Sequence, residues 1–335
     1  MLTTPVATLD APAPDNAIPT PGRPAATHVL SRRAIAAHVG IGTTATILAA
    51  VAPRSAPGAT RPGSRGAATQ KRGLYVLQNV VPSAIAAATQ FDVKVIEVTR
   101  DGANDWFTRA EVTGMKSAGA PVIGYFSLGE AENYRDYWNA ALAAGIVGPV
   151  DPDWPGNFEV AFWSSAWLDI CYDYCDRMIA HGYDGIYFDV VDEYALRWAV
   201  SHVPGGTLAS SANAMLTLIE NIRTRAHAKA PNFRIWANGA EALLDNPRYA
   251  AAIDGMYKEE VFFLNNALQP AREYDFTARQ LRKAVTAGRD VVCIEYITGA
   301  AKVTTCKSLC ASYGFGYYVA DPDLELDGID FEGVS

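Results

Sequence analysis

The stretch GYDGIYFDVVDEY, residues 182–194, changes character within a few positions. The apolar run at 186–188 ends in Asp189, and Asp192 and Glu193 follow closely. Short runs of β-branched and aromatic residues favour a buried strand. A buried strand that ends in carboxylates predicts that its C-terminal end opens onto solvent and a ligand.

Seven more runs of this kind recur along residues 71–335, and Ala-rich, helix-like stretches such as 107–120 and 214–230 separate them. Strand followed by helix, eight times over about 250 residues, is typical of a (β/α)8 TIM barrel of the α/β class. A doubly wound open sheet is the alternative, but residues 74–84 lack the Gly-rich phosphate loop that it needs after the first strand. The eight predicted strands are 73–79, 93–98, 121–127, 184–190, 233–239, 253–260, 290–296 and 315–320.

The first 70 residues contain no Trp, Tyr or Phe and are rich in Ala, Pro, Thr and Gly, so they cannot bury a core. Within them, Ser31-Arg32-Arg33 precedes an apolar run of small residues that ends near residue 52. This pattern predicts a twin-arginine-type export signal and a low-complexity linker over 1–70, with a membrane anchor or a disordered tail as alternatives. We expect a secreted or periplasmic protein with no membrane span after processing, and a monomer.

Net charge limits the possible partners. The chain has a formal charge of −8, and the leader carries six basic and two acidic residues, so residues 71–335 carry −12. An acidic domain is a poor partner for nucleic acid, whose phosphates require clustered Lys and Arg. It suits a neutral or cationic ligand.

Cysteines and histidines contribute little to the predicted chemistry. The five cysteines are an odd number, which argues against a complete disulfide framework. Cys306 and Cys310 could pair in a loop, whereas Cys171 and Cys293 are expected to be buried thiols. All five histidines fall outside the strand ends, so we expect neither a metal site nor a cofactor.

Polar residues gather where the predicted strands end. In a barrel these ends share one mouth, where the chemistry occurs. Asp184 and Asp254 instead open their strands at the opposite end, so a structural role is expected for both. A long aromatic connection at 128–165 is predicted to contribute to binding as well. The predicted substrate-binding residues are Gln78, Asp101, Tyr125, Glu130, Glu132, Tyr134, Trp138, Asp192, Asn238, Glu295 and Tyr296.

Clustered carboxylates beside aromatics suit metal binding, glycoside hydrolysis or a solvated rim. Glycoside hydrolysis needs only two carboxyl groups that flank one bond. Asp189 is the first candidate, and Glu259 or Glu260 is the second. Because strand side chains alternate, only one of these two glutamates can face inward.

The segments FDVKVIEVTRDG, VIGYFSLGEAENYRDYW, GYDGIYFDVVDEY and IDGMYKEEVFF resemble glycoside hydrolase family 114, the endo-α-1,4-polygalactosaminidase-like proteins. The resemblance covers nearly all of residues 73–320. It implies a TIM barrel that hydrolyses α-linked, galactosamine-containing polysaccharide.

The resemblance also assigns roles, and through the Tyr-Arg-x-Tyr-Trp loop at 134–138 it adds Arg135 to the predicted substrate-binding residues. It makes Asp189 the nucleophile and Glu259 the acid/base of a retaining reaction, by analogy with related α-glycosidase barrels. This sequence differs from the family pattern at Val190, where many members carry Asn, and at Val261, where many carry Cys. The alternatives are a transglycosylase, a metal-dependent hydrolase and a catalytically inactive carbohydrate-binding barrel on the same scaffold.

Overall fold

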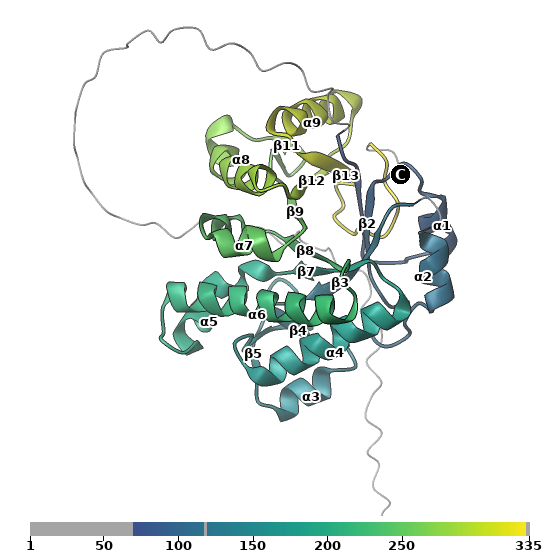
Figure 1. Cartoon of the computed structure of the whole chain (residues 1–335). Helices are drawn as coiled ribbons and strands as arrows, with labels where there is room; N and C mark the ends of the chain where they lie inside the picture. Colours follow the sequence, from purple (N-terminus) through teal and green to yellow (C-terminus); the bar gives the residue numbers. More distant parts are fainter. Residues whose placement is uncertain (1–69, 117–118, 333–335) are drawn as a thin grey trace, which may run out of the picture.

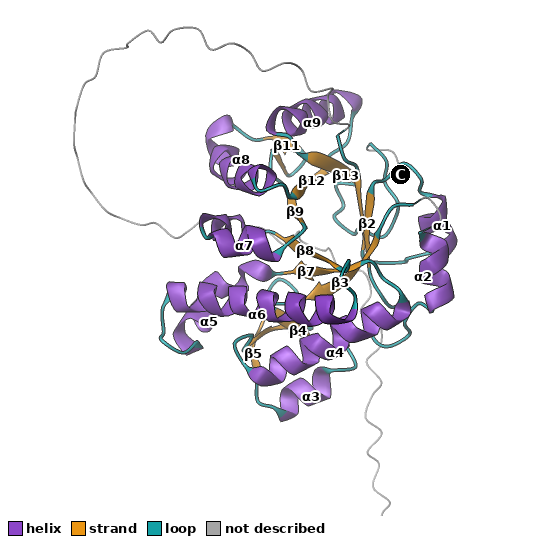
Figure 2. Ribbon diagram, in the orientation of Figure 1, coloured by secondary structure: helices purple, strands orange, loops and turns teal. Residues whose placement is uncertain are grey.

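The computed structural model describes residues 70–116 and 119–332 (Figure 1). The predicted export signal and nearly all of the linker therefore lie outside the described residues. Figure 2 shows strands at the centre with helices around them, as a barrel requires.

Eight parallel strands form the central sheet, in the order β1-β2-β3-β7-β8-β9-β12-β13. A bridge between Arg72 and Tyr317 closes the ring, and the Tyr317 N–H donates to the Lys71 carbonyl at 3.0 Å. All eight predicted strands are confirmed, and so is the barrel. The strands are β1 (Gly73–Val76), β2 (Val93–Ile96), β3 (Val122–Ser127), β7 (Gly185–Asp189), β8 (Arg234–Asn238), β9 (Gly255–Glu259), β12 (Asp290–Tyr296) and β13 (Gly316–Ala320).

Helices connect the strands on the outside of the barrel (Figure 1). Several begin at the residue type that a helix start requires: Thr108 caps α2, Ser164 caps α4 and Thr207 caps α6, each accepting a backbone N–H. The helices are α1 (Pro82–Ala87), α2 (Arg109–Met115), α4 (Ser165–His181), α5 (Arg197–His202), α6 (Leu208–Lys229), α7 (Pro247–Ala252), α8 (Ala271–Thr286) and α9 (Ala300–Tyr313), with the 3₁₀ helices η2 (Val191–Ala195) and η3 (Glu241–Asp245).

Aromatic rings fill the inside of the barrel. The ring centres of Tyr75, Tyr187 and Tyr257, from three different strands, lie 5.3–5.9 Å apart. Trp236 joins them because Gly255 leaves room for its ring, where a Cβ would come within 2.6 Å. Side chains alternate along a strand, so Asp189 and Glu259 stand two residues above Tyr187 and Tyr257 on the same inward face.

The connection at 128–165 contains regular structure, which sequence reasoning did not predict. Strands β4 (Glu130–Glu132), β6 (Asn157–Val160) and β5 (Val147–Val150) form a small antiparallel sheet, and helix α3 (Trp138–Ala143) joins β4 to β5. We call residues 130–160 the mouth subdomain, because it follows the C-terminal end of β3. A second insertion, the hairpin β10 (Phe263–Leu264) and β11 (Ala267–Leu268), follows β9.

The two acids at the opposite end of the barrel are structural, as predicted. Asp184 accepts the Val122 N–H at 2.9 Å and an ion pair from Lys116 at 3.0 Å. Asp254 accepts the Ile235 N–H at 2.9 Å. Each carboxylate therefore ties its own strand to a neighbour.

The cysteines are all buried and free. The proposed loop pairing of Cys306 with Cys310 was wrong, because both lie on helix α9. The expected burial of Cys171 and Cys293 is confirmed.

A C-terminal segment, residues 321–332, follows β13. The Leu326 carbonyl accepts the N–H groups of Leu77 and Gln78 just beyond β1. Phe331 packs edge-on against Phe91 at 5.9 Å. The segment thus spans the junction between the first and last strands. Among the helices of residues 70–116 and 119–332, none has the length and apolar character to cross a membrane.

Candidate active site

Asp189 lies at the end of β7 and is 2% exposed. The Tyr125 hydroxyl donates to its Oδ2 at 2.9 Å. Asn238 Nδ2 and the Val190 N–H donate to its Oδ1 at 3.0 and 2.9 Å. Three donors on one carboxylate stabilise its anion and fix the direction in which it points.

Glu259, at the end of β9, shares a partner with Asp189. Asn238 Nδ2 donates to Glu259 Oε1 at 2.8 Å and to Asp189 Oδ1 at 3.0 Å. The Tyr296 hydroxyl donates to Glu259 Oε2 at 2.5 Å. The two acceptor oxygens can be at most 5.8 Å apart, because both lie on one nitrogen at those distances.

The choice between Glu259 and Glu260 follows from the backbone. Glu260 has a φ of +52°, and its N–H donates to the Ile294 carbonyl at 2.8 Å. The chain therefore leaves the barrel wall at Glu260, and Glu259 is the glutamate beside Asn238.

Three neighbouring strands leave the barrel in the same way. Val190, Ala240 and Glu260 follow β7, β8 and β9, and each has a positive φ of 50–54°. For a β-branched residue such as Val190 this conformation is a true outlier, and such strain is concentrated at functional sites. Asn, which many members of the resembled family carry here, adopts it more easily.

A buried lysine lies among acids beside this cluster. Lys258 Nζ is 3.5 Å from Glu241 Oε2, and both side chains are less than 10% exposed. Burial alone would lower the pKa of Lys258, but Glu241, Asp192 and Glu259 together raise it. Burial raises the pKa of Asp192, Lys258 opposes that rise, and Asp189 adds to it. Asp192 is therefore near enough to Asp189 for their charges to interact.

A second buried network joins the barrel to the mouth subdomain. Arg135 makes two hydrogen bonds to Glu97, at 2.7 and 2.9 Å, and one to Glu132 at 2.7 Å. The Tyr134 hydroxyl donates to Glu132 at 2.5 Å, whereas 45% of the residue's surface stays exposed. Burial of that hydroxyl, together with Glu132, raises the pKa of Tyr134. The network holds an exposed aromatic ring in a fixed position.

Glu130 and Trp138 also lie in the mouth subdomain. Asn157 Nδ2 donates to Glu130 Oε2 at 2.9 Å, and Glu130 is 1% exposed. The Trp138 ring packs 4.8 Å from Phe158. Half-buried Trp138 therefore packs inside the subdomain, as part of its small core.

Three further predicted binding residues lie outside both the central cluster and the mouth subdomain. Gln78 donates to Glu325 of the C-terminal segment, and Asp101 Oδ1 accepts the N–H groups of residues 103, 104 and 105. Glu295 is fully buried and accepts the Phe262 and Phe263 N–H groups at 2.8 and 3.1 Å. Burial raises the pKa of Glu295 to about 8, against the opposing effect of those two bonds. All three side chains hold loops at the mouth.

Sequence reasoning missed Glu97, Lys258 and Glu241. Glu97 directly follows β2, as Asp189 ends β7, so the same pattern of an apolar run that stops at an acid could have identified it. Lys258 is a charged residue inside a buried strand, and charges are rarely buried unless they are paired.

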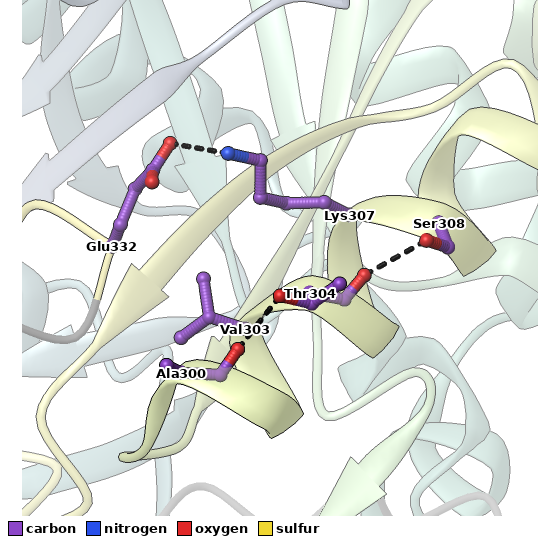
Figure 3. Close-up of a pocket in the computed structure, with 6 residues that line it drawn as sticks. All are labelled: Ala300, Val303, Thr304, Lys307, Ser308 and Glu332. Carbon is purple, nitrogen blue, oxygen red and sulfur yellow. Dashed lines mark hydrogen bonds and ion pairs between the residues drawn. The ribbon is translucent and has the colours of Figure 1, made fainter.

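The described chain also has a surface pocket of about 390 Å³ on helix α9 (Figure 3). Lys307 and Glu332 pair across it at 2.7 Å. Its lining includes none of the residues of the central cluster. Among residues 70–116 and 119–332, no three His, Cys, Asp or Glu side chains are arranged to hold a metal ion.

Comparison with known proteins gives a family match and similar structures. Residues 57–332 match the family model described as glycoside-hydrolase family GH114. An uncharacterized protein of Deinococcus radiodurans is 33% identical over 240 residues, which cover 70% of this chain and 74% of that protein.

Two solved structures share the fold. The glycoside hydrolase domain of PelA from Pseudomonas aeruginosa aligns with a TM-score of 0.59 and 18% identity, covering 76% of this chain and 96% of that domain. Aspergillus fumigatus Ega3, in complex with galactosamine, aligns with a TM-score of 0.59 and 18% identity, covering 80% of this chain and 97% of Ega3.

Proposed function

The chain belongs to glycoside hydrolase family GH114 and is a glycosidase, and from this premise we propose that it cleaves α-linked, galactosamine-containing polysaccharide with Asp189 and Glu259. The observation that carries the proposal is the single Asn238 amide that contacts both carboxylates. A non-catalytic barrel would have no need to hold two acids on one donor.

The separation of the two acids supports retention of configuration. Their amide-bound oxygens are at most 5.8 Å apart. Retaining glycosidases hold their carboxyl groups about 5–5.5 Å apart, whereas inverting enzymes leave about 6.5–9.5 Å for a water molecule.

In the proposed reaction, an Asp189 oxygen attacks the anomeric carbon while the bond to the leaving oxygen breaks. Protonated Glu259 gives its proton to that oxygen. Glu259, now a carboxylate, then takes a proton from water as the water attacks the anomeric carbon and releases Asp189. The proposed roles follow from the surroundings, because Asp189 is buried among three donors whereas Glu259 is partly exposed.

Charge and similarity support the substrate class. Residues 71–335 carry a formal charge of −12, which would attract a partly deacetylated, cationic galactosamine polymer. Ega3, which shares the fold, was solved in complex with galactosamine. We place this activity outside the cytoplasm, on the strength of the Ser31-Arg32-Arg33 pattern.

The test is hydrolysis of a panel of galactosamine- and N-acetylgalactosamine-containing polymers, read as released oligosaccharides. Asp189→Asn and Glu259→Gln should each lower kcat by about 10³-fold or more, because each removes a reacting group. Glu260→Gln is the matched control and should keep its activity. Normal turnover by either active-site variant would overturn the assignment, and loss in the control would move the second role to Glu260.

A further inference from the structure

Three glutamates converge where the mouth subdomain meets the barrel. Glu130 and Glu159 are directly paired residues of β4 and β6, so their side chains share one face of the small sheet. Glu193 belongs to η2, and its carboxylate is close enough to both for their charges to raise its pKa. These three residues form what we call the glutamate triad.

Two residues of the triad are shielded from water, and the third, Glu159, is half-buried. Glu130 and Glu193 are 1% and 4% exposed. Glu193 Oε2 and Glu159 Oε2 are buried and have no hydrogen-bond partner in the described chain. A buried carboxylate oxygen without a donor is costly, and protonation is the usual remedy.

The charges that act on Glu193 do not neutralise it. The charges that act most strongly on Glu193 are those of Glu130, Asp192, Glu159 and Asp151, and these four are acidic. His202, on α5, acts on Glu159 in the opposite sense. In the described part of the chain, no Lys or Arg forms an ion pair with Glu159 or Glu193. Burial first, and then these acids, raise the pKa of Glu193 well above its ordinary value.

The triad is mechanically linked to Asp189. Gly129 directly precedes β4, and a Cβ there would lie 2.2 Å from the Val190 carbonyl oxygen and 2.5 Å from Glu193 Cγ. Val190 in turn donates its N–H to Asp189. Movement of η2 away from the mouth subdomain would therefore move the backbone that holds the proposed nucleophile.

We propose that the triad is a pH-sensitive latch, in which a proton held by Glu193 keeps η2 docked on the mouth subdomain and its loss at higher pH loosens the Asp189 end of β7. The latch would regulate the proposed active site, so this inference rests on the proposed function. The protonated form of the latch is the docked one, because an ionised Glu193 would face other acids, and no Lys or Arg of residues 70–116 and 119–332 forms an ion pair with it.

The direction of the pH effect follows from linkage. A carboxyl whose pKa is raised on folding stabilises the folded state less and less as pH rises from its unfolded pKa to its folded one. Glu193→Gln copies the protonated carboxyl, so it should remove this decline.

The first test measures Tm from pH 4 to pH 9, and it needs no substrate. Glu193→Gln should have a Tm close to that of the wild type at pH 4 and several degrees higher at pH 8. Glu159→Gln should shift Tm in the same direction by less. Glu273→Gln removes an exposed carboxylate of α8 and is the control for charge, so its curve should follow the wild type.

The second test measures hydrogen exchange of residues 190–196 and the pH profile of kcat/KM on a galactosamine polymer. In Glu193→Gln, residues 190–196 should exchange their amide hydrogens more slowly than in the wild type at pH 8. The alkaline limb of the kcat/KM profile should move by about one pH unit or more toward higher pH. A Glu193→Gln curve parallel to the wild-type Tm curve would overturn the latch, and so would strong stabilisation of the wild type by Ca²⁺, which would make the triad a cation site. If no polymer is cleaved but the Tm result holds, the proposed function fails and the latch remains.

Discussion

At the scale of single residues, the site depends on Asn238. Its amide nitrogen contacts both Asp189 and Glu259, which come from the strands on either side of β8. The sequence predicted Asn238 at the mouth because it ends a strand. It could not show that one amide serves both acids, since that depends on the relative stagger of three strands.

Asn238→Ala should lower kcat by about 10²-fold with little change in KM, because it frees both carboxylates to turn without removing a reacting group. Steady-state kinetics on the galactosamine polymer measures this. Asn139→Ala, on the exposed side of α3, is the control and should be neutral. A variant that changes only KM would mean that Asn238 binds substrate rather than positioning the acids.

Gly129 lies at a close approach between two backbone segments that leaves no room for a side chain. Gly129→Ala would place a methyl group 2.2 Å from the Val190 carbonyl oxygen, so it should lower the free energy of unfolding by more than about 2 kcal/mol and reduce activity. Gly114, on α2, has open space around it, and Gly114→Ala should stabilise the protein by about 0.5–1 kcal/mol. Urea unfolding measures the free energy of unfolding of both variants. Equal changes in the two would contradict the close approach of Gly129 to the Val190 carbonyl.

At the scale of elements, the mouth subdomain is the part that sequence reasoning described least well. The connection at 128–165 was predicted as an aromatic loop. Its strands have only three or four residues, so they are too short to show alternation in the sequence. The eight barrel strands were visible because each is an apolar run buried on both faces.

Arg135 docks this subdomain on the barrel. Arg135→Ala should cost about 3–5 kcal/mol, since it leaves the buried carboxylates of Glu97 and Glu132 without their cation. Arg279→Ala breaks an exposed pair with Asp275 and should cost less than about 1 kcal/mol. Urea unfolding measures both, and similar small losses would show that the subdomain is held by other contacts.

At the scale of the whole molecule, buried acids set the dependence of stability on pH. Burial raises the pKa of Glu295 to about 8, and the pKa values of Glu193 and Asp330 are raised too. Ion pairs and hydrogen bonds lower the pKa of acids nearer the surface. Arg100 and Thr108, for example, lower the pKa of Glu111 to about 2. Sequence alone could not reveal these shifts, because they depend on which carboxyls the fold encloses.

The Tm of the wild-type protein should therefore be highest near pH 5 and should fall toward pH 8. Groups with raised pKa values lose their contribution as pH rises from about 4.5 through the folded value, at up to about 1.4 kcal/mol per pH unit for each proton. Scanning calorimetry at a series of pH values measures the curve. A Tm that is constant or rises between pH 5 and pH 8 would show that these carboxyls are ionised in the folded state.

The bridge between Arg72 and Tyr317 joins two distant parts of the sequence. These partners are 245 positions apart, so the ring cannot shut until almost the entire polypeptide is available, and slow closure is the expected kinetic signature. Gln70 donates to the Lys307 carbonyl and Glu332 accepts from Lys307 Nζ, so the first and last residues of the barrel domain that the structure describes lie close together. A circular permutant that links residue 332 to residue 70 and opens the exposed turn at Gly205-Gly206 should therefore fold to the same barrel. In that permutant β13 and β1 are close in sequence, so their pairing should form early in folding.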